Sequence, residues 1–144
     1  MASRIANVAP VGSLLKGDQN KRRPKPQKSA RKFDGEHLEA IRQCPCIVCL
    51  KDPAGVAAHV RFASAKDGKP ITGIGVKPDD ERTVPLCPSC HTDSNDAQHV
   101  IGEAKFWARA KIDPIKASIE LHKHSPNIEA MRQIVFLFNT ASRM

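Results

Sequence analysis

The chain has 144 residues and a formal net charge of +8, which suits one compact domain with a tail and leaves too little length for two cores of ordinary size. No apolar run approaches the roughly 18 residues that a membrane-spanning helix needs, and Asn7, Pro10 and Gly12 interrupt the opening segment, which excludes the continuous apolar core of a secretory signal. We therefore expect a protein of a reducing cytoplasm with no membrane partner, whose five cysteines serve metal ligation rather than disulfides.

The positive charge is concentrated at the amino-terminal end. Residues 1–34 carry nine Lys or Arg and two Asp, a net charge of +7, and the rest of the chain carries +1. This segment lacks apolar periodicity, so we expect a tail that is disordered when free. Such a tail favours a polyanion partner, most simply nucleic acid, although a solvated linker is the alternative. The candidate nucleic-acid-binding residues are Lys21, Arg22, Arg23, Lys25, Lys28, Arg31 and Lys32.

The next elements alternate between helix and strand signals. Asp34 is a potential cap for a short helix that runs to Gln43. The segment "VAAHVRFAS" is rich in small and β-branched residues and predicts a strand, and a long stretch punctuated by Gly and Pro leads to a second short strand before Cys87. A helix is predicted to begin between Ser89 and His91.

The carboxy-terminal part is predicted to be helical. An amphipathic helix over 100–112 would pack on the core, and Pro114 after Asp113 and Pro126 after Ser125 predict the starts of two more helices. The buried side of the 100–112 helix would hold either Val100, Ala104, Trp107 and Ala108, or Ile101, Ala104, Ala108 and Ile112. The fold class is therefore α+β, with a tail at 1–34, a core at 35–113 and helices at 114–144 that pack on the core.

Two Cys-x-x-Cys pairs predict a metal site. Cys46 with Cys49, and Cys87 with Cys90, offer four thiolates in the spacing typical of a structural zinc. The 37 residues between the pairs exceed the 15 to 20 of a compact four-cysteine finger, so the metal would clamp a substantial segment. Cys44 is interpreted as an ordinary small apolar residue.

A four-thiolate site is closed, so the nearby histidines need another role. His91 and His99 are eight residues apart and would share one face of a regular helix. With His59 and Asp80 they would form an open, catalytic metal site. The alternatives are a knuckle-capping or surface role for His91, an ordinary amphipathic-helix position for His99, a core histidine at position 59 and a turn-forming Asp80.

The order of these motifs resembles the zinc-bearing HNH (His-Me finger) endonucleases. The residues that carry the resemblance are Cys46-x-x-Cys49, "AHVR", "KPDD", "VPLCPSCH", His99 and "GEAKFW", over about residues 44–122. They look most similar to the compact phage and prophage branch, which includes recombination-associated nucleases of the Ref type.

The resemblance implies a small ββα-metal core stapled by the four-cysteine zinc. His59 matches the general base on the first strand and His91 a ligand of the catalytic ion, while His99 and Asp80 match a further helix histidine and a loop carboxylate. Ala58 stands where many members have a metal-ligating Asp or His, so His99, Asp80 or water would complete the metal sphere. Arg82 stands where many members have the asparagine that orients the base, and Asp80 is expected to share that role.

The expected activity is hydrolysis of DNA phosphodiester bonds with little sequence specificity. His59 would take a proton from water, and a Mg²⁺, Mn²⁺ or Zn²⁺ ion on His91, with His99 and Asp80, would stabilise the developing charge. Arg61, one strand step past His59, would contact the phosphate unless it is simply solvated.

The resemblance also implies a biological setting, namely recombination or DNA processing of a phage or prophage in a bacterial host cell. The strand form of the DNA stays open between single-stranded, double-stranded and recombinase-coated, and a recombinase is a candidate partner. A second hypothesis is a zinc-stapled nucleic-acid-binding accessory module that does no chemistry, and a third is a scaffold that docks a partner through the apolar run "IEAMRQIVFLF".

Overall fold

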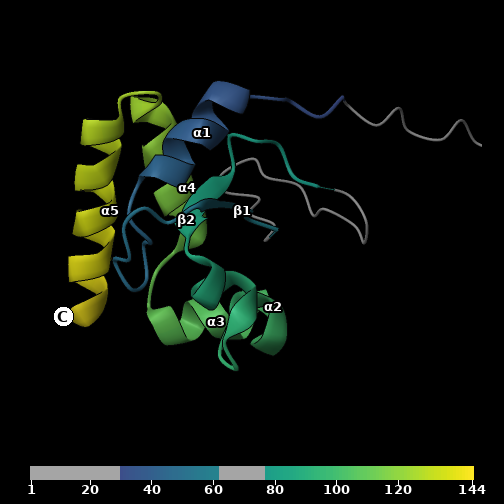
Figure 1. The fold of residues 1–144 in the computed structure, drawn as a ribbon, viewed down its shortest axis with the longest axis vertical. Coiled ribbons are helices and arrows are strands. Elements are labelled where there is room, and N and C mark those ends of the chain that lie inside the picture. The colour runs from purple at the N-terminus through teal and green to yellow at the C-terminus, as the bar shows by residue number, and fades with distance from the viewer. Residues whose placement is uncertain (1–29, 62–76) are drawn as a thin grey trace, which may run out of the picture.

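The computed structural model describes residues 30–61 and 77–144, and it has a mixed α+β fold. The elements are α1 (Gly35–Gln43), β1 (Val56–His59), β2 (Thr83–Leu86), the π-helical turn η2 (Ser89–Asp93), α2 (Gln98–Ile101), α3 (Glu103–Ala110), α4 (Pro114–His124) and α5 (Ile128–Arg143) (Figure 1). The predicted α+β class is confirmed. None of the described helices combines the length and apolar character that crossing a membrane requires.

The two strands form an antiparallel pair at the centre of the molecule. Val56 lies opposite Leu86 at one end of the ladder, and His59 lies opposite Thr83 at the other. All four residues of β2 are buried, which fits the run of apolar and β-branched side chains in this strand. Both strands were predicted, and the pairing places His59 at the carboxyl end of β1.

Helices cover the pair on different sides. The helix α1 contacts both strands and α5, and α4 contacts β2 and α5, whereas η2, α2 and α3 gather at the other end of the molecule (Figure 1). The side chains with no solvent exposure include Ile41, Ile47, Val60, Val84, Leu86, Leu121, Met131 and Val135. One continuous core therefore joins the strands to α1, α4 and α5.

The helix starts follow local capping signals. The Asp34 carboxylate accepts the His37 N–H at 3.0 Å, and the Asp113 carboxylate accepts the amides of the first turn of α4, which confirms both predicted starts. The predicted start of α5 is wrong, because Asn127 is the cap and its side chain accepts the Ala130 N–H at 3.1 Å.

The prediction that His91 and His99 share one helix is also wrong. The backbone is extended at Ser94 and Ala97, which ends η2 and delays α2 until Gln98. Gly102, with φ of 89°, then separates α2 from α3.

The predicted buried faces of the 100–112 helix change with this break. Ala104 and Ala108 are exposed, and the buried residues of α3 are Phe106 and Trp107. Trp107 and Ile112 were among the candidates, whereas Phe106 was not.

Candidate active site

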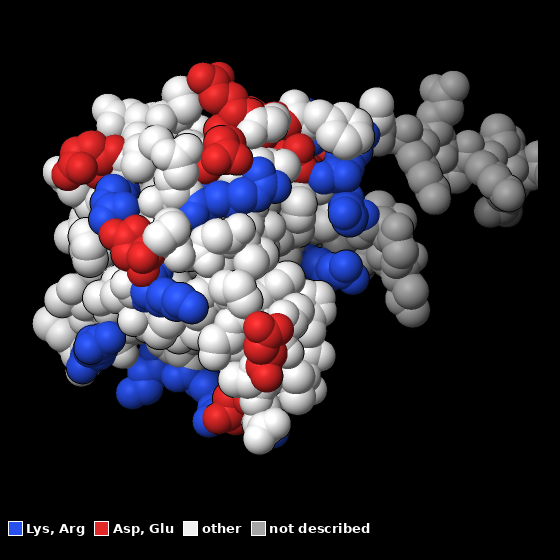
Figure 2. Space-filling view, in the orientation of Figure 1, with Lys and Arg blue, Asp and Glu red and all other residues white. Residues whose placement is uncertain are grey.

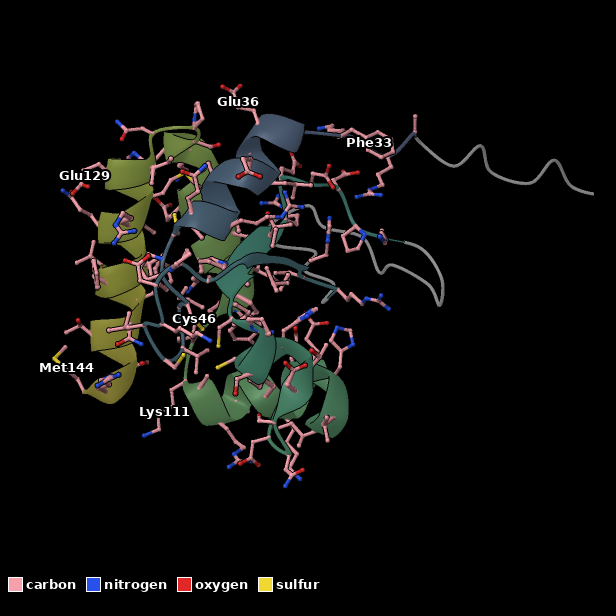
Figure 3. All side chains as sticks on the ribbon, in the orientation of Figure 1. Phe33, Glu36, Cys46, Lys111, Glu129 and Met144 are labelled. Atoms are coloured by element: carbon pink, nitrogen blue, oxygen red, sulfur yellow. The ribbon has the colours of Figure 1, made fainter. Side chains whose placement is uncertain are left out.

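Four sulfur atoms come together between the strand pair and α3. The Sγ atoms of Cys46, Cys49, Cys87 and Cys90 lie within 4.8 Å of one another, and Figure 3 shows Cys46 inside the molecule. Cys87 follows β2 directly, and the Ile47 N–H donates to the Pro85 carbonyl at 3.0 Å, so β2 aligns the two cysteine pairs. The four cysteines are thus placed to hold a metal ion such as zinc, as predicted.

The four thiols shift one another's protonation. A hydrogen bond with Cys90 lowers the pKa of Cys46 to about 5, and the same contact raises the pKa of Cys90. Thiolates this close repel one another unless a cation neutralises them, and Zn²⁺ binds four thiolates tetrahedrally. Cys44 lies outside the cluster, and burial raises the pKa of its thiol to about 11.

His59 and Asp80 form a first pair, separate from the cysteine cluster. His59 Nε2 lies 2.9 Å from Asp80 Oδ1, and the Asp80 carboxylate also accepts from the Arg31 guanidinium and, at 3.0 Å, from the Asp34 N–H. Burial alone would raise the pKa of Asp80, but the hydrogen bonds from His59, the Asp34 amide and Arg31 outweigh it and lower the pKa to about 2. Asp80 is therefore ionised at neutral pH and acts as an acceptor.

This carboxylate determines which nitrogen of His59 carries the proton. Because an ionised Asp80 can only accept, Nε2 of His59 must be the donor in the 2.9 Å contact. The 3.2 Å distance from Arg31 Nη2 to the same ring nitrogen then reflects two donors that meet at one carboxylate oxygen. In neutral His59 the lone pair is consequently on Nδ1, and Asp80 holds the ring in place.

His91 and His99 form the second pair, across the break between η2 and α2. Their Nε2 atoms are 3.0 Å apart, and their rings are nearly perpendicular. Burial and the neighbouring His99 lower the pKa of His91, which favours the neutral imidazole that binds metals. This 3.0 Å gap is short enough for one ion to bind both nitrogens.

A backbone contact connects the strand that carries His59 to the helices that carry the histidine pair. The Arg61 N–H donates to both carboxylate oxygens of Glu103, at 3.0 and 3.3 Å. Arg61 follows His59 by two residues, and Glu103 begins α3, with Gly102 between it and α2. The carboxyl end of β1 thus lies beside the α2–α3 junction. Glu103 was not predicted, since nothing near it in the sequence indicates a contact 42 residues away.

The predicted site residues are therefore arranged as two pairs. Asp80 was predicted to join His91 and His99 around an ion, but its hydrogen-bond partners are His59, Arg31 and the Asp34 amide. Within residues 30–61 and 77–144, the four cysteines are the group of His, Cys, Asp or Glu side chains with metal-type spacing.

The predicted tail is described only at its end. Lys21, Arg22, Arg23, Lys25 and Lys28 lie outside the described residues. Residues 30–34 lie against the segment before β2, where the Lys32 N–H donates to Asp79 at 2.9 Å. Figure 2 shows Lys and Arg side chains gathered where the described chain begins.

A surface hollow of about 220 Å³ lies beside Cys90 of the second cysteine pair. Apolar side chains such as Phe106 line it, together with Cys90 and the ion pair between Arg109 and Asp96, but His59, Asp80, His91 and His99 do not. The hollow is thus separate from the histidine pairs.

Comparison with models of known protein families, with curated proteins and with solved structures found no match to this chain. Its function is therefore inferred from its own residues.

Proposed function

We propose that this protein is a metal-dependent endonuclease of the HNH type, which hydrolyses DNA phosphodiester bonds with little sequence specificity. The observation that carries the proposal is the 2.9 Å contact between His59 Nε2 and Asp80 Oδ1 at the end of β1. A histidine held by a buried carboxylate is a common general base. The antiparallel pair followed by a helical turn with His91 supports the ββα-metal interpretation of the core.

The chemistry follows from the His59–Asp80 pair and the His91–His99 pair. Nδ1 of His59 accepts a proton from water as the water oxygen forms a bond to phosphorus, and ionised Asp80 stabilises the resulting imidazolium. The bond from phosphorus to the 3′ oxygen breaks, and this oxygen takes its proton from solvent. A divalent ion bound by His91 and His99 would stabilise the negative charge on the phosphate and on the leaving oxygen.

The four-cysteine cluster has a structural role in this proposal. It joins the segment after α1 to the segment after β2, and His91 follows Cys90 directly. A zinc ion on the four sulfurs would thus position the helical turn that bears His91. We assign DNA binding to the basic tail, and recombination or processing of phage DNA as the setting.

Cleavage assays test the proposal directly. Zinc-loaded protein is incubated with supercoiled plasmid, with circular single-stranded DNA and with recombinase-coated DNA, in the presence of Mg²⁺, Mn²⁺ or added Zn²⁺. We expect metal-dependent cutting that falls by about 10²-fold or more in His59→Ala. His124→Ala, a change at an exposed histidine in the last turn of α4, should cut like the wild type.

DNA affinity distinguishes the alternatives. If His59 acts in chemistry, His59→Ala binds DNA as tightly as the wild type. If both proteins bind equally and neither cuts any substrate with any ion, the nuclease proposal fails and a non-catalytic zinc-stapled nucleic-acid-binding module takes its place.

A further inference from the structure

Arg31, a residue of the basic tail, reaches the His59–Asp80 pair. Its Nε donates to the Pro78 carbonyl at 3.0 Å and its Nη2 donates to Asp80 Oδ1. Its guanidinium carbon lies 4.7 Å from the centre of the Phe33 ring, and Figure 3 shows Phe33 where the described chain begins. A carbonyl, a carboxylate and an aromatic face thus fix the plane of this guanidinium.

The guanidinium still has donors to offer. An arginine carries five N–H groups, and within the described part of the chain Arg31 uses two of them, one to Pro78 and one to Asp80. The side chain keeps 27% of its surface exposed, whereas Asp80 keeps 3%. The Arg31 guanidinium is therefore held by Pro78 and Asp80 while part of its surface stays open to solvent.

The position of Arg31 relative to His59 suits phosphate binding. Nη2 lies 3.2 Å from His59 Nε2, so the guanidinium lies beside the ring whose Nδ1 is the proposed base. The planar fork of arginine matches two phosphate oxygens, and Asp80 neutralises Arg31 only in part when His59 becomes protonated beside it.

We propose that Arg31 binds the scissile phosphodiester of a nucleic acid beside His59, so that the basic tail ends in the residue that positions the substrate. This inference rests on the proposed nuclease function. It assigns Arg31 a role distinct from that of the other tail cations, which would contact the phosphate backbone at large.

Matched variants separate the two roles. Arg31→Ala and Lys32→Ala each remove one positive charge from neighbouring positions, and the Lys32 side chain is 72% exposed. In each variant the salt dependence of DNA binding should weaken, with the slope of log K for binding against log salt about 0.9 less negative for duplex DNA. We expect kcat/KM for cleavage to fall about 10²-fold in Arg31→Ala and less than fivefold in Lys32→Ala. Arg31→Lys should recover the salt dependence of binding but only part of kcat/KM.

Two results would overturn the proposal. Equal kcat/KM in Arg31→Ala and Lys32→Ala would make Arg31 one tail charge among others. Faster cleavage by Arg31→Ala would show that the guanidinium blocks the site. Thermal unfolding of each variant controls for loss of structure, and if Arg31→Ala is unfolded, the comparison of Arg31→Lys with the wild type decides.

A binding measurement keeps this inference separate from the nuclease function. If the wild type cuts no DNA, a deoxydinucleotide with one phosphodiester is titrated and the ring signals of His59 are followed by NMR. We expect the signals to shift in the wild type and in Lys32→Ala but not in Arg31→Ala. Equal shifts in all three proteins, or none in any, overturn the inference.

Discussion

At the scale of single residues, Asp80 is the buried carboxylate that accepts three hydrogen bonds in the candidate site. One of its oxygens accepts from both His59 and Arg31, and the other accepts the Asp34 N–H at 3.0 Å. It thereby fixes the tautomer of the proposed base and holds the end of the basic tail in place.

Asp80→Asn should impair catalysis more than binding. An amide can still accept from the Asp34 N–H, but it cannot stabilise a protonated His59 and can favour the wrong tautomer. We expect kcat to fall about 10²-fold or more, measured in the plasmid assay with DNA affinity in parallel. Asp79→Asn, next in the chain, is the control, and equal rates for the two variants would contradict the role of Asp80.

His37 is a buried histidine that the sequence did not single out. The Thr83 hydroxyl donates to the Asp80 carbonyl at 3.0 Å, so it accepts from His37 Nε2, which lies 3.1 Å away. Nδ1 is buried without a hydrogen-bond partner in the described structure. Burial, and next the neighbouring His122, lower the pKa of His37 to about 4.

This histidine should make stability depend on pH. Its pKa in the folded protein, about 4, is below the ordinary value of 6.5, so the unfolded chain binds the proton first as the pH falls. The free energy of unfolding therefore keeps its full value above pH 6.5, as far as His37 is concerned. It falls by about 3 kcal/mol as the pH is lowered from 6.5 to about 4.

His37→Gln isolates this effect, because glutamine can donate to Thr83 but does not titrate. Urea unfolding at matched zinc should show the stability of the wild type relative to His37→Gln declining from pH 7 to pH 4. A difference that stays constant over this range would show that His37 keeps its ordinary pKa when folded.

At the scale of elements, Gly102 separates α2 from α3. Its φ of 89° with ψ of 145° is a conformation that other residues rarely adopt, and a Cβ built there meets nothing within 4 Å. Gly102→Ala should therefore destabilise the fold by about 1 to 3 kcal/mol through backbone strain alone. Gly35→Ala, with ordinary φ and equally open space, should be neutral or slightly stabilising in the same urea titration. Equal effects would contradict the strain argument.

The helix α5 holds the first cysteine pair in place. Asn139, which is buried, donates from Nδ2 to the carbonyls of Ile47 and Val48, both at 2.9 Å. Asn139→Ala leaves these carbonyls without their donor, so we expect a loss of about 2 to 4 kcal/mol in unfolding free energy and weaker zinc retention against a chelator. Thr140→Ala, at the exposed neighbouring position, is the control, and equal zinc retention in the two variants would exclude this role of α5.

The elements that were predicted correctly have signals within a few residues of one another. Asp34 and Asp113 each cap the helix that follows directly, and both cysteine pairs show their spacing in four residues. The predicted single helix face for His91 and His99 failed because the segment between them, "TDSNDAQ", favours turns over helix. The two rings meet nevertheless, across the break.

At the scale of the whole molecule, the sequence indicated candidate site residues but not which of them contact one another. His59 and Asp80 are 21 residues apart and Arg31 and Asp80 are 49 apart, so no local pattern records these contacts. They depend on the strand register and on the packing of residues 30–34 against the segment before β2, which are properties of the folded chain. The composition likewise indicated a basic tail but not that Arg31 would reach the base.

We propose that the chain holds two metals with different tasks, a structural ion on the four cysteines and a catalytic ion on His91 and His99. The most direct test is the plasmid nicking rate of zinc-loaded protein as a function of Mn²⁺ concentration, for the wild type and His91→Ala. We expect a rate that saturates with Mn²⁺ in the wild type and falls about 10²-fold or more in His91→Ala, while both proteins retain about one zinc per chain. Nicking by the wild type that does not depend on the added ion, or equal rates in the two proteins, would contradict it.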